Sequence, residues 1–461
     1  MKKVSFVSLG CDKNTVDSEV MLSLLTDHGY TITKNDEEAD AIVINTCAFI
    51  ADAQEESINT IIEMGEYKET GACKALVVTG CLAQRFADQI PSELPEVDAI
   101  VGTGSYEKIV EALDQALAKS AGEDPEQKII IRDPLEERPL GYQKRTIITP
   151  GYFEYLKLGV GCDNRCTYCI IPFLRGGYRS RPREALLREA RELADQGVKE
   201  LILVAQDITK YGTDFSDGYR LPQLLKDLCG IEGIEWIRLL YCYPEDVSDE
   251  LIETIAEEQK IVKYIDIPIQ HASDTVLRRM ARKHNHQTLT DLLERLRTRI
   301  PEICIRTTLI TGFPGETEEE FEELYDFVRE SRFDRLGVFC YSQEDGTAAA
   351  RMKDQVDDEI KEERKDRLME LQRSISEEKS ALFVGREMRA LIEGRIPGEE
   401  TEDGSYIYSA RTYRDAPDID GFVFVTTDRE LRSGDFVKVR ITGSYEYDLI
   451  GEVLSVEEEI L

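Results

Sequence analysis

The segment LKLGVGCDNRCTYCIIPFLR occupies residues 156–175 and contains three closely spaced cysteines, Cys162, Cys166 and Cys169. The apolar residues before them are typical of a β-strand, and the glycines that follow allow a sharp turn. Three thiolates at a Cys-x3-Cys-x2-Cys spacing can converge on one metal centre. Because the segment supplies no fourth ligand, an iron–sulfur cluster held here would keep one iron open for a substrate, against which the ring of Tyr168 can pack.

This spacing, with an aromatic residue before the last cysteine, resembles the signature of the radical S-adenosylmethionine (SAM) superfamily. The resemblance implies that the amino and carboxylate groups of SAM chelate the open iron of a 4Fe-4S cluster. The alternatives are a structural zinc site and three buried free thiols. Zinc sites usually have four ligands, and neither a second pair of cysteines nor a nearby histidine completes one here. The motif therefore favours the radical SAM interpretation.

The composition is that of a globular protein. The 461 residues suffice for about three domains, and 41% of them are hydrophobic. Eleven cysteines make an odd number at low density, which favours metal ligation over a disulfide framework. The N-terminal apolar run is interrupted too early for a signal peptide, and no stretch is long and apolar enough for a membrane span. We therefore expect a soluble protein in a cytoplasmic setting.

The formal net charge of −34 limits the kinds of partner that the protein can attract. A strongly acidic surface repels the phosphates of nucleic acids and favours a basic partner. The alternative is that the acidic residues serve solubility alone.

Three more cysteines share one topological position in the first part of the chain. The segments KVSFVSLG, DAIVINT and ALVVTG each read as a buried strand followed by an amphipathic helix, which predicts a parallel sheet. Each strand ends directly at a cysteine, respectively Cys11, Cys47 and Cys81. Ligand groups of an open α/β sheet gather beyond the carboxyl ends of its strands. The pattern therefore predicts a second three-cysteine cluster with an open iron; the alternative is three small buried residues at strand ends.

The rest of the chain divides into a linker and two further domains. We expect an N-terminal α/β domain over residues 1–116, a linker over 117–150 with a possible edge strand at Ile129 to Ile131, and a core over 151–375. The core repeats a strand-plus-helix unit, with candidate strands at 154–160, 200–205, 236–241, 263–267, 304–310 and 335–341. Six units are too few for a closed eight-unit barrel. The radical SAM resemblance implies an open (βα)6 partial barrel of the TIM type.

Four residues outside the cysteine motif are candidates for SAM binding. In TLITGFPGET (308–317), Gly312 and Gly315 allow the backbone to approach a ligand, and the resemblance assigns this segment to SAM. Arg306 on the fifth strand and Gln206 after the second are candidates for contacts to polar groups of SAM. A structural salt bridge is the alternative for Arg306.

The C-terminal part changes character. Residues 356–382 predict a long, solvated connecting helix. His284 and His286, in a polar stretch before it, are expected to be solvent-exposed. Five short strands over residues 381–461 predict a small antiparallel β-barrel, which resembles the TRAM module. This module has nine Lys or Arg residues against eighteen Asp or Glu residues, so we expect it to bind a basic protein surface.

The three parts together resemble the methylthiotransferases. One branch of that family modifies adenosine in transfer RNA, and the other modifies the β-carbon of an aspartate in the small-subunit ribosomal protein S-twelve. The segment SLGCDKNTVDSE resembles the protein-modifying branch, because the tRNA branch more often has Gly-Cys-Gln-Met-Asn there. The segments DAPDID (415–420) and YDLIG (447–451) also resemble the protein-modifying branch. The acidic barrel agrees with this choice, since ribosomal proteins are basic.

The resemblance implies a reaction with two 4Fe-4S clusters and SAM. The cluster on Cys162, Cys166 and Cys169 would cleave SAM to a radical that takes a hydrogen from the unactivated β-carbon. The N-terminal cluster would hold the sulfur to be methylated and transferred. A reductant protein is the expected further partner, and tRNA and membranes are not expected. The alternative functions are a tRNA adenosine methylthiotransferase and a non-catalytic iron–sulfur protein.

Overall fold

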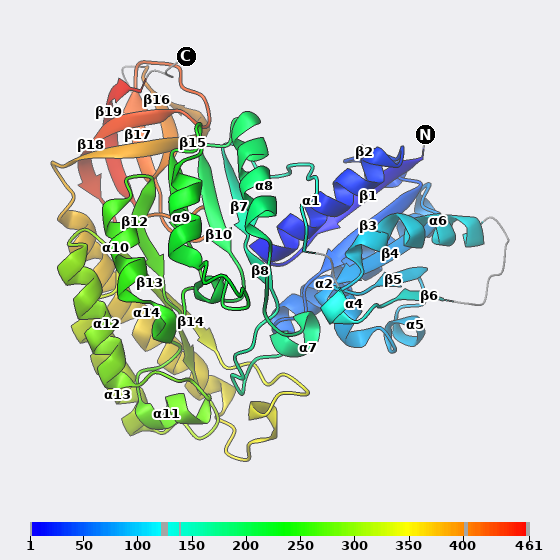
Figure 1. Ribbon diagram of the computed structural model, residues 1–461, viewed down its shortest axis with the longest axis horizontal. Helices are drawn as coiled ribbons and strands as arrows, with labels where there is room; N and C mark the ends of the chain where they lie inside the picture. Colours follow the sequence, from blue (N-terminus) through cyan, green and yellow to red (C-terminus); the bar gives the residue numbers. More distant parts are fainter. Residues whose placement is uncertain (1, 121–127, 138–139, 401–403, 458–461) are drawn as a thin grey trace.

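The protein consists of an N-terminal α/β part, a central α/β part and a C-terminal β-barrel (Figure 1). The computed structural model describes residues 2–120, 128–137, 140–400 and 404–457. Within these ranges, no helix is long and apolar enough to cross a membrane. Six short 3-10 helices also occur: η1 (Asp36–Glu38), η2 (Tyr106–Lys108), η3 (Leu135–Glu137), η4 (Ile208–Lys210), η5 (Pro244–Asp246) and η6 (Ala349–Arg351).

The N-terminal part contains a six-stranded parallel sheet in the order β2-β1-β3-β4-β5-β6. Its strands are β1 (Lys3–Ser8), β2 (Thr31–Thr33), β3 (Ala41–Thr46), β4 (Ala75–Gly80), β5 (Ala99–Val101) and β6 (Ile129–Ile131). Its helices are α1 (Asp12–Asp27), α2 (Ala51–Gly65), α3 (Tyr67–Thr70), α4 (Cys81–Phe86), α5 (Ile90–Glu93) and α6 (Ile109–Ser120). The three expected strands are present as β1, β3 and β4, and the expected edge strand is β6. Since β3 and β4 are buried at every position, helices cover both faces of the sheet.

The central part contains a second six-stranded parallel sheet, in the order β14-β13-β12-β11-β10-β7. Its strands are β7 (Phe153–Lys157), β10 (Glu200–Val204), β11 (Trp236–Leu239), β12 (Ile261–Asp266), β13 (Cys304–Thr311) and β14 (Arg335–Cys340). Its helices are α8 (Arg183–Asp195), α9 (Leu221–Cys229), α10 (Asp249–Glu257), α11 (Asp274–Arg279), α12 (His286–Arg299) and α13 (Glu318–Ser331). The sheet is open, with β7 and β14 as its edges, as expected for a partial barrel.

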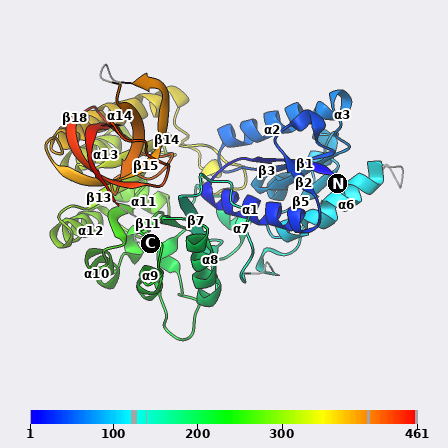
Figure 2. The ribbon, with the colours of Figure 1, turned by 90° about the horizontal axis from the view of Figure 1, so that it is seen from above.

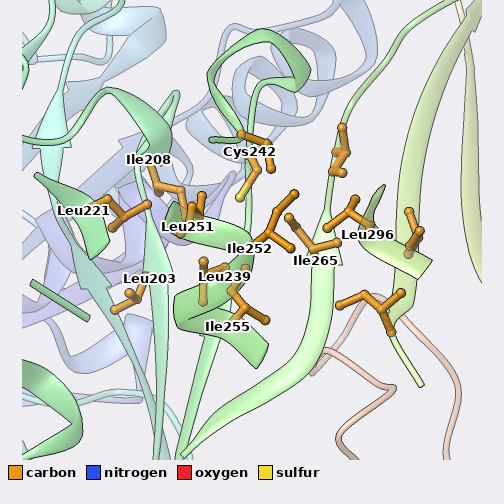
Figure 3. Packing of buried hydrophobic residues seen from close by; sticks show 14 of the residues in the cluster. Leu203, Ile208, Leu221, Leu239, Cys242, Leu251, Ile252, Ile255, Ile265 and Leu296 are labelled. Atoms are coloured by element: carbon orange, nitrogen blue, oxygen red, sulfur yellow. The ribbon is translucent and has the colours of Figure 1, made fainter. Parts of the chain in front are cut away.

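The main hydrophobic layer lies between this sheet and its helices (Figure 3). Leucine and isoleucine side chains of the strands pack there against those of α10 and α12, and all are nearly inaccessible to solvent. The residues are Leu203, Leu239 and Ile265 from the strands and Leu251, Ile252, Ile255 and Leu296 from the helices. Burying one such side chain contributes about 1.5–3 kcal/mol. This layer therefore holds the strand ends that carry the site in fixed positions.

The long helix α14 (Asp358–Ala381) is a packed element and not the solvated connector that the charge pattern predicts. Leu368 and Ile375 are buried in the main hydrophobic layer, and the side chain of Gln372 donates a hydrogen bond to the carbonyl of Phe333 at 3.0 Å. The charged side chains of Lys361 and Arg364 are also buried. The sequence pattern missed this contact because buried Lys, Arg and Gln side chains resemble those of an exposed helix face.

The C-terminal part is a closed barrel in the strand order β15-β16-β17-β19-β18. Its strands are β15 (Glu387–Glu400), β16 (Tyr406–Thr412), β17 (Val423–Thr427), β18 (Phe436–Ser444) and β19 (Leu449–Val456). All five expected strands are present. Closure leaves the small sheet without an unpaired edge.

The barrel packs into the concave face of the central sheet, on the side away from the helices (Figure 2). The rings of Trp236 and Phe436 meet edge to face, with 4.9 Å between their centroids. The carboxylate of Glu200 pairs with Arg238 at 2.7 Å and with Arg411 of the barrel at 2.8 Å. All three charged side chains are fully buried. The barrel is therefore fixed to the core by apolar packing and a buried ionic contact.

The DAPDID loop of the barrel takes part in the same contact. Asp415 forms an ion pair with Arg335 at the start of β14. Asp420 accepts a hydrogen bond from the hydroxyl of Tyr264 at 2.8 Å. The loop thus packs against the core, and of its three aspartates Asp418 alone is exposed. In this chain Asp415 and Asp420 therefore contact the core domain.

A second buried ionic contact joins the N-terminal and central parts. The guanidinium of Arg145 pairs with the carboxylates of Glu19 on α1, Glu154 on β7 and Glu189 on α8, the last at 2.8 Å. Burial raises the pKa of Glu154, the positive charge of Arg145 lowers it, and the neighbouring Glu19 raises it further. Arg145 joins carboxylates of α1, β7 and α8, with Arg181 as a second cation beside Glu189, and thereby holds α1 against the core.

We expect Arg145→Met to destabilise the protein by about 3–5 kcal/mol, because the buried carboxylates of Glu19 and Glu154 lose their counter-ion. Urea unfolding of the full chain measures the difference. The matched control is Lys144→Met, since the neighbouring Lys144 forms an exposed ion pair with Asp27 and should change stability by less than about 0.5 kcal/mol. Equal stability of the two variants would show that the Arg145 contact contributes nothing.

Candidate functional site

The three central cysteines lie on the loop between β8 (Gly159–Val160) and α7 (Ile171–Arg175). β8 pairs antiparallel with β9 (Arg179–Ser180), which closes the loop into a narrow ribbon. Gly161 turns the chain with a φ of 75°, and a Cβ atom there would collide with the carbonyl oxygen of Gly177. Only glycine therefore fits at the entrance of the cysteine loop.

Hydrogen bonds from distant segments hold this loop. The amide of Cys162 donates to the carbonyl of Gly176 at 3.0 Å. The amide of Thr167 donates to the carbonyl of Met280 at 3.0 Å, and its carbonyl accepts from the amide of Ala349 at 2.8 Å. The loop is thus fixed from both sides before any ligand binds.

The three thiols are buried close to one another. Burial and the charge of the neighbouring thiols raise the pKa of Cys169 to about 12, and burial raises the pKa of Cys162 to about 11. The guanidinium of Arg282 approaches Cys166 Sγ at 3.8 Å and stacks on the ring of Tyr243, 4.3 Å from its centroid. The sequence analysis missed Arg282, because an arginine in a basic stretch far from the motif gives no local signal.

The N-terminal cysteines gather at the carboxyl edge of the first sheet. Cys11 precedes α1, Cys47 follows β3 and Cys81 begins α4. A Cβ atom at Gly10 would lie 2.9 Å from Cys47 Cβ, so glycine is needed for this approach. Burial, together with the charges of Cys81 and Cys11, raises the pKa of Cys47 to about 11. The structure therefore brings these three cysteines together, as the shared strand-end position predicts.

The sulfur ligands of both cysteine groups suit an iron–sulfur cluster. In the ranges that the structure describes, no three His, Cys, Asp or Glu side chains are placed to hold one ion. The thiolates of a 4Fe-4S cluster bind different irons and are spaced more widely than ligands of one ion. Each group also offers three soft sulfur ligands in a mostly buried setting. The donor set therefore suits a cluster with one iron left open.

Helix α7 connects the two cysteine groups. It begins two residues after Cys169 and is about 7 Å long. Its last residue, Arg175, donates a hydrogen bond to Cys81 Sγ at 3.4 Å and pairs with Asp17 at 2.8 Å. α7 lies between the N-terminal and central parts in both ribbon views (Figures 1 and 2). Arg175 is the last residue of the segment 156–175 that contains the three central cysteines. Its contact with the distant Cys81 is visible only in the tertiary structure.

The carboxyl ends of the two sheets face each other. Arg85 on α4 pairs with Glu344, which follows β14, at 2.6 Å. Gln54 on α2 donates a hydrogen bond to the same carboxylate at 2.8 Å. On the other side, Lys13 at the start of α1 lies 3.2 Å from the centroid of the Tyr241 ring, just after β11. The two groups of strand ends thus bound a common region.

Tyr168 and Gln206 are the first two candidates for SAM binding. The ring of Tyr168 packs against a buried cluster that contains Met280, Phe313 and Tyr341. The side-chain oxygen of Gln206, just after β10, is buried and has no hydrogen-bond donor among the described residues. A buried acceptor without a partner is uncommon and suits a missing polar ligand. Their roles in SAM binding stay predictions.

The remaining candidates contact other parts of the protein. A Cβ atom at Gly312 would collide with Lys361 of α14, and one at Gly315 with Arg279 of α11. Arg306 pairs with Asp266 at 2.8 Å and lies 3.7 Å from Asp420 of the barrel. The contacts that the structure gives these three residues are therefore with protein, and their roles toward SAM also stay predictions.

His284 is buried, contrary to the solvent-exposed position expected from its polar neighbours. Its ring nitrogens lie 3.1 Å from the carboxylate of Glu245 and 3.1 Å from the carbonyl of Ile269. Although burial opposes it, the contact with His284 and the charge of Arg282 lower the pKa of Glu245 to about 2. The prediction failed because these polar partners come from distant loops. His286 is exposed, as expected.

We expect Gly161→Ala to displace the central cysteine loop, because φ is positive there and the added methyl group collides with backbone. After anaerobic reconstitution, the variant should bind roughly half the iron of the unmodified chain, if each cysteine group holds one four-iron cluster. The matched control is Gly141→Ala, whose added methyl group meets no atom within 4 Å. Full iron content in Gly161→Ala would contradict the proposed constraint.

Comparison with protein families gives three matches along the chain. The radical SAM superfamily matches residues 156–328, the uncharacterized protein family UPF0004 matches residues 3–102, and the TRAM domain matches residues 384–454. These ranges fall respectively on the central part, the N-terminal sheet and the barrel. The radical SAM match implies a 4Fe-4S cluster and SAM.

Relatives and solved structures agree with these matches. The ribosomal protein uS12 methylthiotransferase RimO of Lachnoclostridium phytofermentans is 54% identical, over 97% of this chain and 99% of the relative. The RimO protein of Acetivibrio thermocellus is 49% identical, over 98% of this chain and 99% of the relative. The radical SAM methyltransferase TsrM from Kitasatospora setae has a similar fold, with a TM-score of 0.55 and 16% identity over 74% of this chain and 75% of TsrM.

Proposed function

Since this chain belongs to the family of ribosomal protein uS12 methylthiotransferases, we propose that it adds a methylthio group to the β-carbon of an aspartate in uS12 by radical SAM chemistry. The observation that carries the proposal is the facing arrangement of two three-cysteine groups, joined by α7. One group suits SAM cleavage and the other suits storage of sulfur. A reaction that needs both must hold its substrate between them.

We propose that each cysteine group holds one 4Fe-4S cluster with an open iron: Cys162, Cys166 and Cys169 the first, and Cys11, Cys47 and Cys81 the second. When bound, the first cluster supplies the electron that cleaves SAM, and the second holds the sulfur that is transferred. Arg282 beside Cys166 and Arg175 beside Cys81 place a positive charge next to each set of thiolates. These charges offset part of the negative charge of a thiolate-ligated cluster.

The protein's own task is placement and exclusion of water. The β-carbon of aspartate carries no hydrogen that a side chain can remove as a proton at neutral pH, so a radical route is needed. Tyr168 and Gln206 are proposed to line the SAM site, the first through its ring and the second through its unpartnered oxygen. Arg306 is proposed to contact polar groups of SAM, and Gly312 and Gly315 are proposed to let the backbone approach it. Holding the reacting groups in a fixed geometry raises the rate of the reaction between them.

The charge distribution supports uS12 as partner over tRNA. The barrel has twice as many acidic as basic residues, which suits a basic ribosomal protein and repels phosphates. A separate reductant protein must deliver electrons, and the place of work would be the cytoplasm, where ribosomes are. We propose that residues 1–116, 151–375 and 381–461 act as the sulfur-holding, SAM-cleaving and substrate-contacting domains, with 117–150 as the connection.

We expect the triple change Cys162→Ala, Cys166→Ala and Cys169→Ala to reduce the iron content from about eight to about four per chain and to abolish SAM cleavage. Changing Cys11, Cys47 and Cys81 to Ala should also leave about four irons, but should retain SAM cleavage while methylthio transfer stops. Iron analysis and quantification of 5′-deoxyadenosine measure the two effects.

The control for the cysteine changes is Cys229→Ala, on α9 and remote from both groups, which should retain iron and activity. SAM cleavage by the first triple variant would refute the assignment of the radical cluster. Loss of 5′-deoxyadenosine formation in a folded second triple variant would refute separate roles.

We expect the full chain to bind uS12 more tightly than tRNA, with an affinity for uS12 that falls as salt rises, because screening weakens the charge attraction. Reversal of the exposed charges of Asp418 and Glu446 should weaken binding about two- to fivefold. Fluorescence anisotropy at two salt concentrations measures both effects. The matched control reverses Glu37 and Glu69, which are exposed on the N-terminal part. Tighter binding of tRNA would exclude the proposed substrate class.

A further inference from the structure

Two charged residues directly after Cys11 form a pair that the proposed chemistry does not yet use. Lys13 Nζ lies 2.8 Å from Asp12 Oδ1 and 3.2 Å from the centroid of the Tyr241 ring. The side chains of Lys13 and Asp12 are 8% and 7% exposed. Burying an ion pair costs free energy, because both charges lose their contact with water. The position of this pair therefore needs an explanation.

The pair lies where the N-terminal and central parts of the protein meet. Tyr241, two residues after the end of β11, belongs to the same short segment as Tyr243, at most about 7 Å further along. The ring of Tyr243 stacks with the Arg282 guanidinium that approaches Cys166, and the ring of Tyr241 contacts the ammonium of Lys13, two residues after Cys11. Lys13 is therefore adjacent to the N-terminal group and contacts the segment of the central part that also contacts Arg282.

Asp12 has one oxygen that lacks a donor. Oδ1 accepts hydrogen bonds from the amide of Lys13 at 2.9 Å and from its ammonium. Oδ2 is buried and has no hydrogen-bond partner among the described residues. Buried carboxylate oxygens are normally hydrogen-bonded, and an oxygen left alone at this place suits a donor that arrives with the substrate.

The other cations near the cysteines already have several partners. Arg175 pairs with Asp17 and also donates to Asn14 and to Cys81 Sγ. Arg282 donates to the carbonyl of Pro268 at 2.8 Å. The ammonium of Lys13 has three hydrogen atoms to donate, and in the described part of the chain its one carboxylate partner is the adjacent Asp12. It therefore retains capacity for a second acceptor.

The proposed substrate supplies such an acceptor. The reacting β-carbon of aspartate is bonded directly to the side-chain carboxyl carbon, so a cation that holds the carboxylate also fixes the β-carbon. That carbon must lie within reach of both cysteine groups, and Lys13 lies near Cys11 where the two parts of the protein meet. In a chain with a net charge of −34, a substrate carboxylate also needs a local cation to offset repulsion.

We propose that Asp12 and Lys13 form the subsite for the target aspartate: the Lys13 ammonium pairs with its carboxylate, and Asp12 Oδ2 accepts an N–H from the same substrate segment. The inference rests on the proposed function. It assigns Lys13 as the residue that distinguishes aspartate from asparagine and other neutral residues at the target position.

The test is a double-mutant cycle measured by binding alone, without SAM or turnover. The probes are recombinant uS12 and copies in which each aspartate is replaced in turn by asparagine, titrated onto the reconstituted full chain. The unmodified enzyme should bind the copy that lacks the target aspartate about 10- to 100-fold more weakly than it binds uS12, because one charge-assisted contact is lost. The Lys13→Met variant should bind uS12 as weakly as the unmodified enzyme binds that copy. The variant should also bind uS12 and that copy with equal affinity. Lys13→Arg, which keeps the charge, should restore much of the discrimination.

Two further variants make the result decisive. Lys13→Met leaves the Asp12 carboxylate buried without a counter-ion, so the neutral double variant Asp12→Asn, Lys13→Met is measured beside it and should also fail to discriminate. Lys74→Met, at an exposed ion pair of the same sheet, is the matched control and should behave as the unmodified enzyme. Full discrimination by either Lys13→Met variant overturns the inference while the proposed function stands. Absence of uS12 binding to the unmodified enzyme overturns both.

Discussion

Two separate parallel sheets present their carboxyl ends to each other, and the proposed joint action of the six cysteines depends on this arrangement. The first sheet gathers three thiols at its carboxyl edge by the ordinary geometry of strand-to-helix turns, whereas the three central thiols lie on the one loop between β8 and α7. Neither sheet alone brings the two groups near each other. Arg145 holds α1 against the core, α7 spans the distance between the groups, and Glu344 receives Arg85 from the facing edge. The site is therefore a property of the interface between two domains.

The barrel covers the concave face of the open central sheet, at the end opposite the carboxyl ends of the strands. Six strands do not close a barrel, and their inner face would expose Trp236 and the charged Glu200 and Arg238 to water. The C-terminal barrel covers them with Phe436 and Arg411. The barrel is thereby kept at a fixed distance from the cysteines, because the contact is buried and ionic and leaves few alternative arrangements.

Positive charge is concentrated beside the cysteines, although the chain as a whole is strongly acidic. Arg282 and Arg175 each approach a cysteine sulfur, and Lys13 lies two residues after Cys11. The acidic residues elsewhere suit attraction of a basic protein, whereas these buried cations suit anionic groups. Under the proposed function, the two charge patterns would serve different steps, recognition at long range and placement at short range.

The fold classes of the N-terminal part, the central part and the barrel, and the two cysteine groups, could be predicted from the amino-acid sequence alone. Strand periodicity, turn residues and ligand spacing are local properties. The six core strands, the five barrel strands and the strand-end positions of Cys11, Cys47 and Cys81 could all be predicted in this way. Tertiary structure alone decided the partners of long polar side chains. Asp415 pairs with Arg335 of the core, His284 was expected in solvent but meets Glu245, and α14 was expected to be solvated but packs against the sheet. In each case the same polar side chain suits water or a buried counter-charge equally well, and only the approach of residues distant in sequence decides between them.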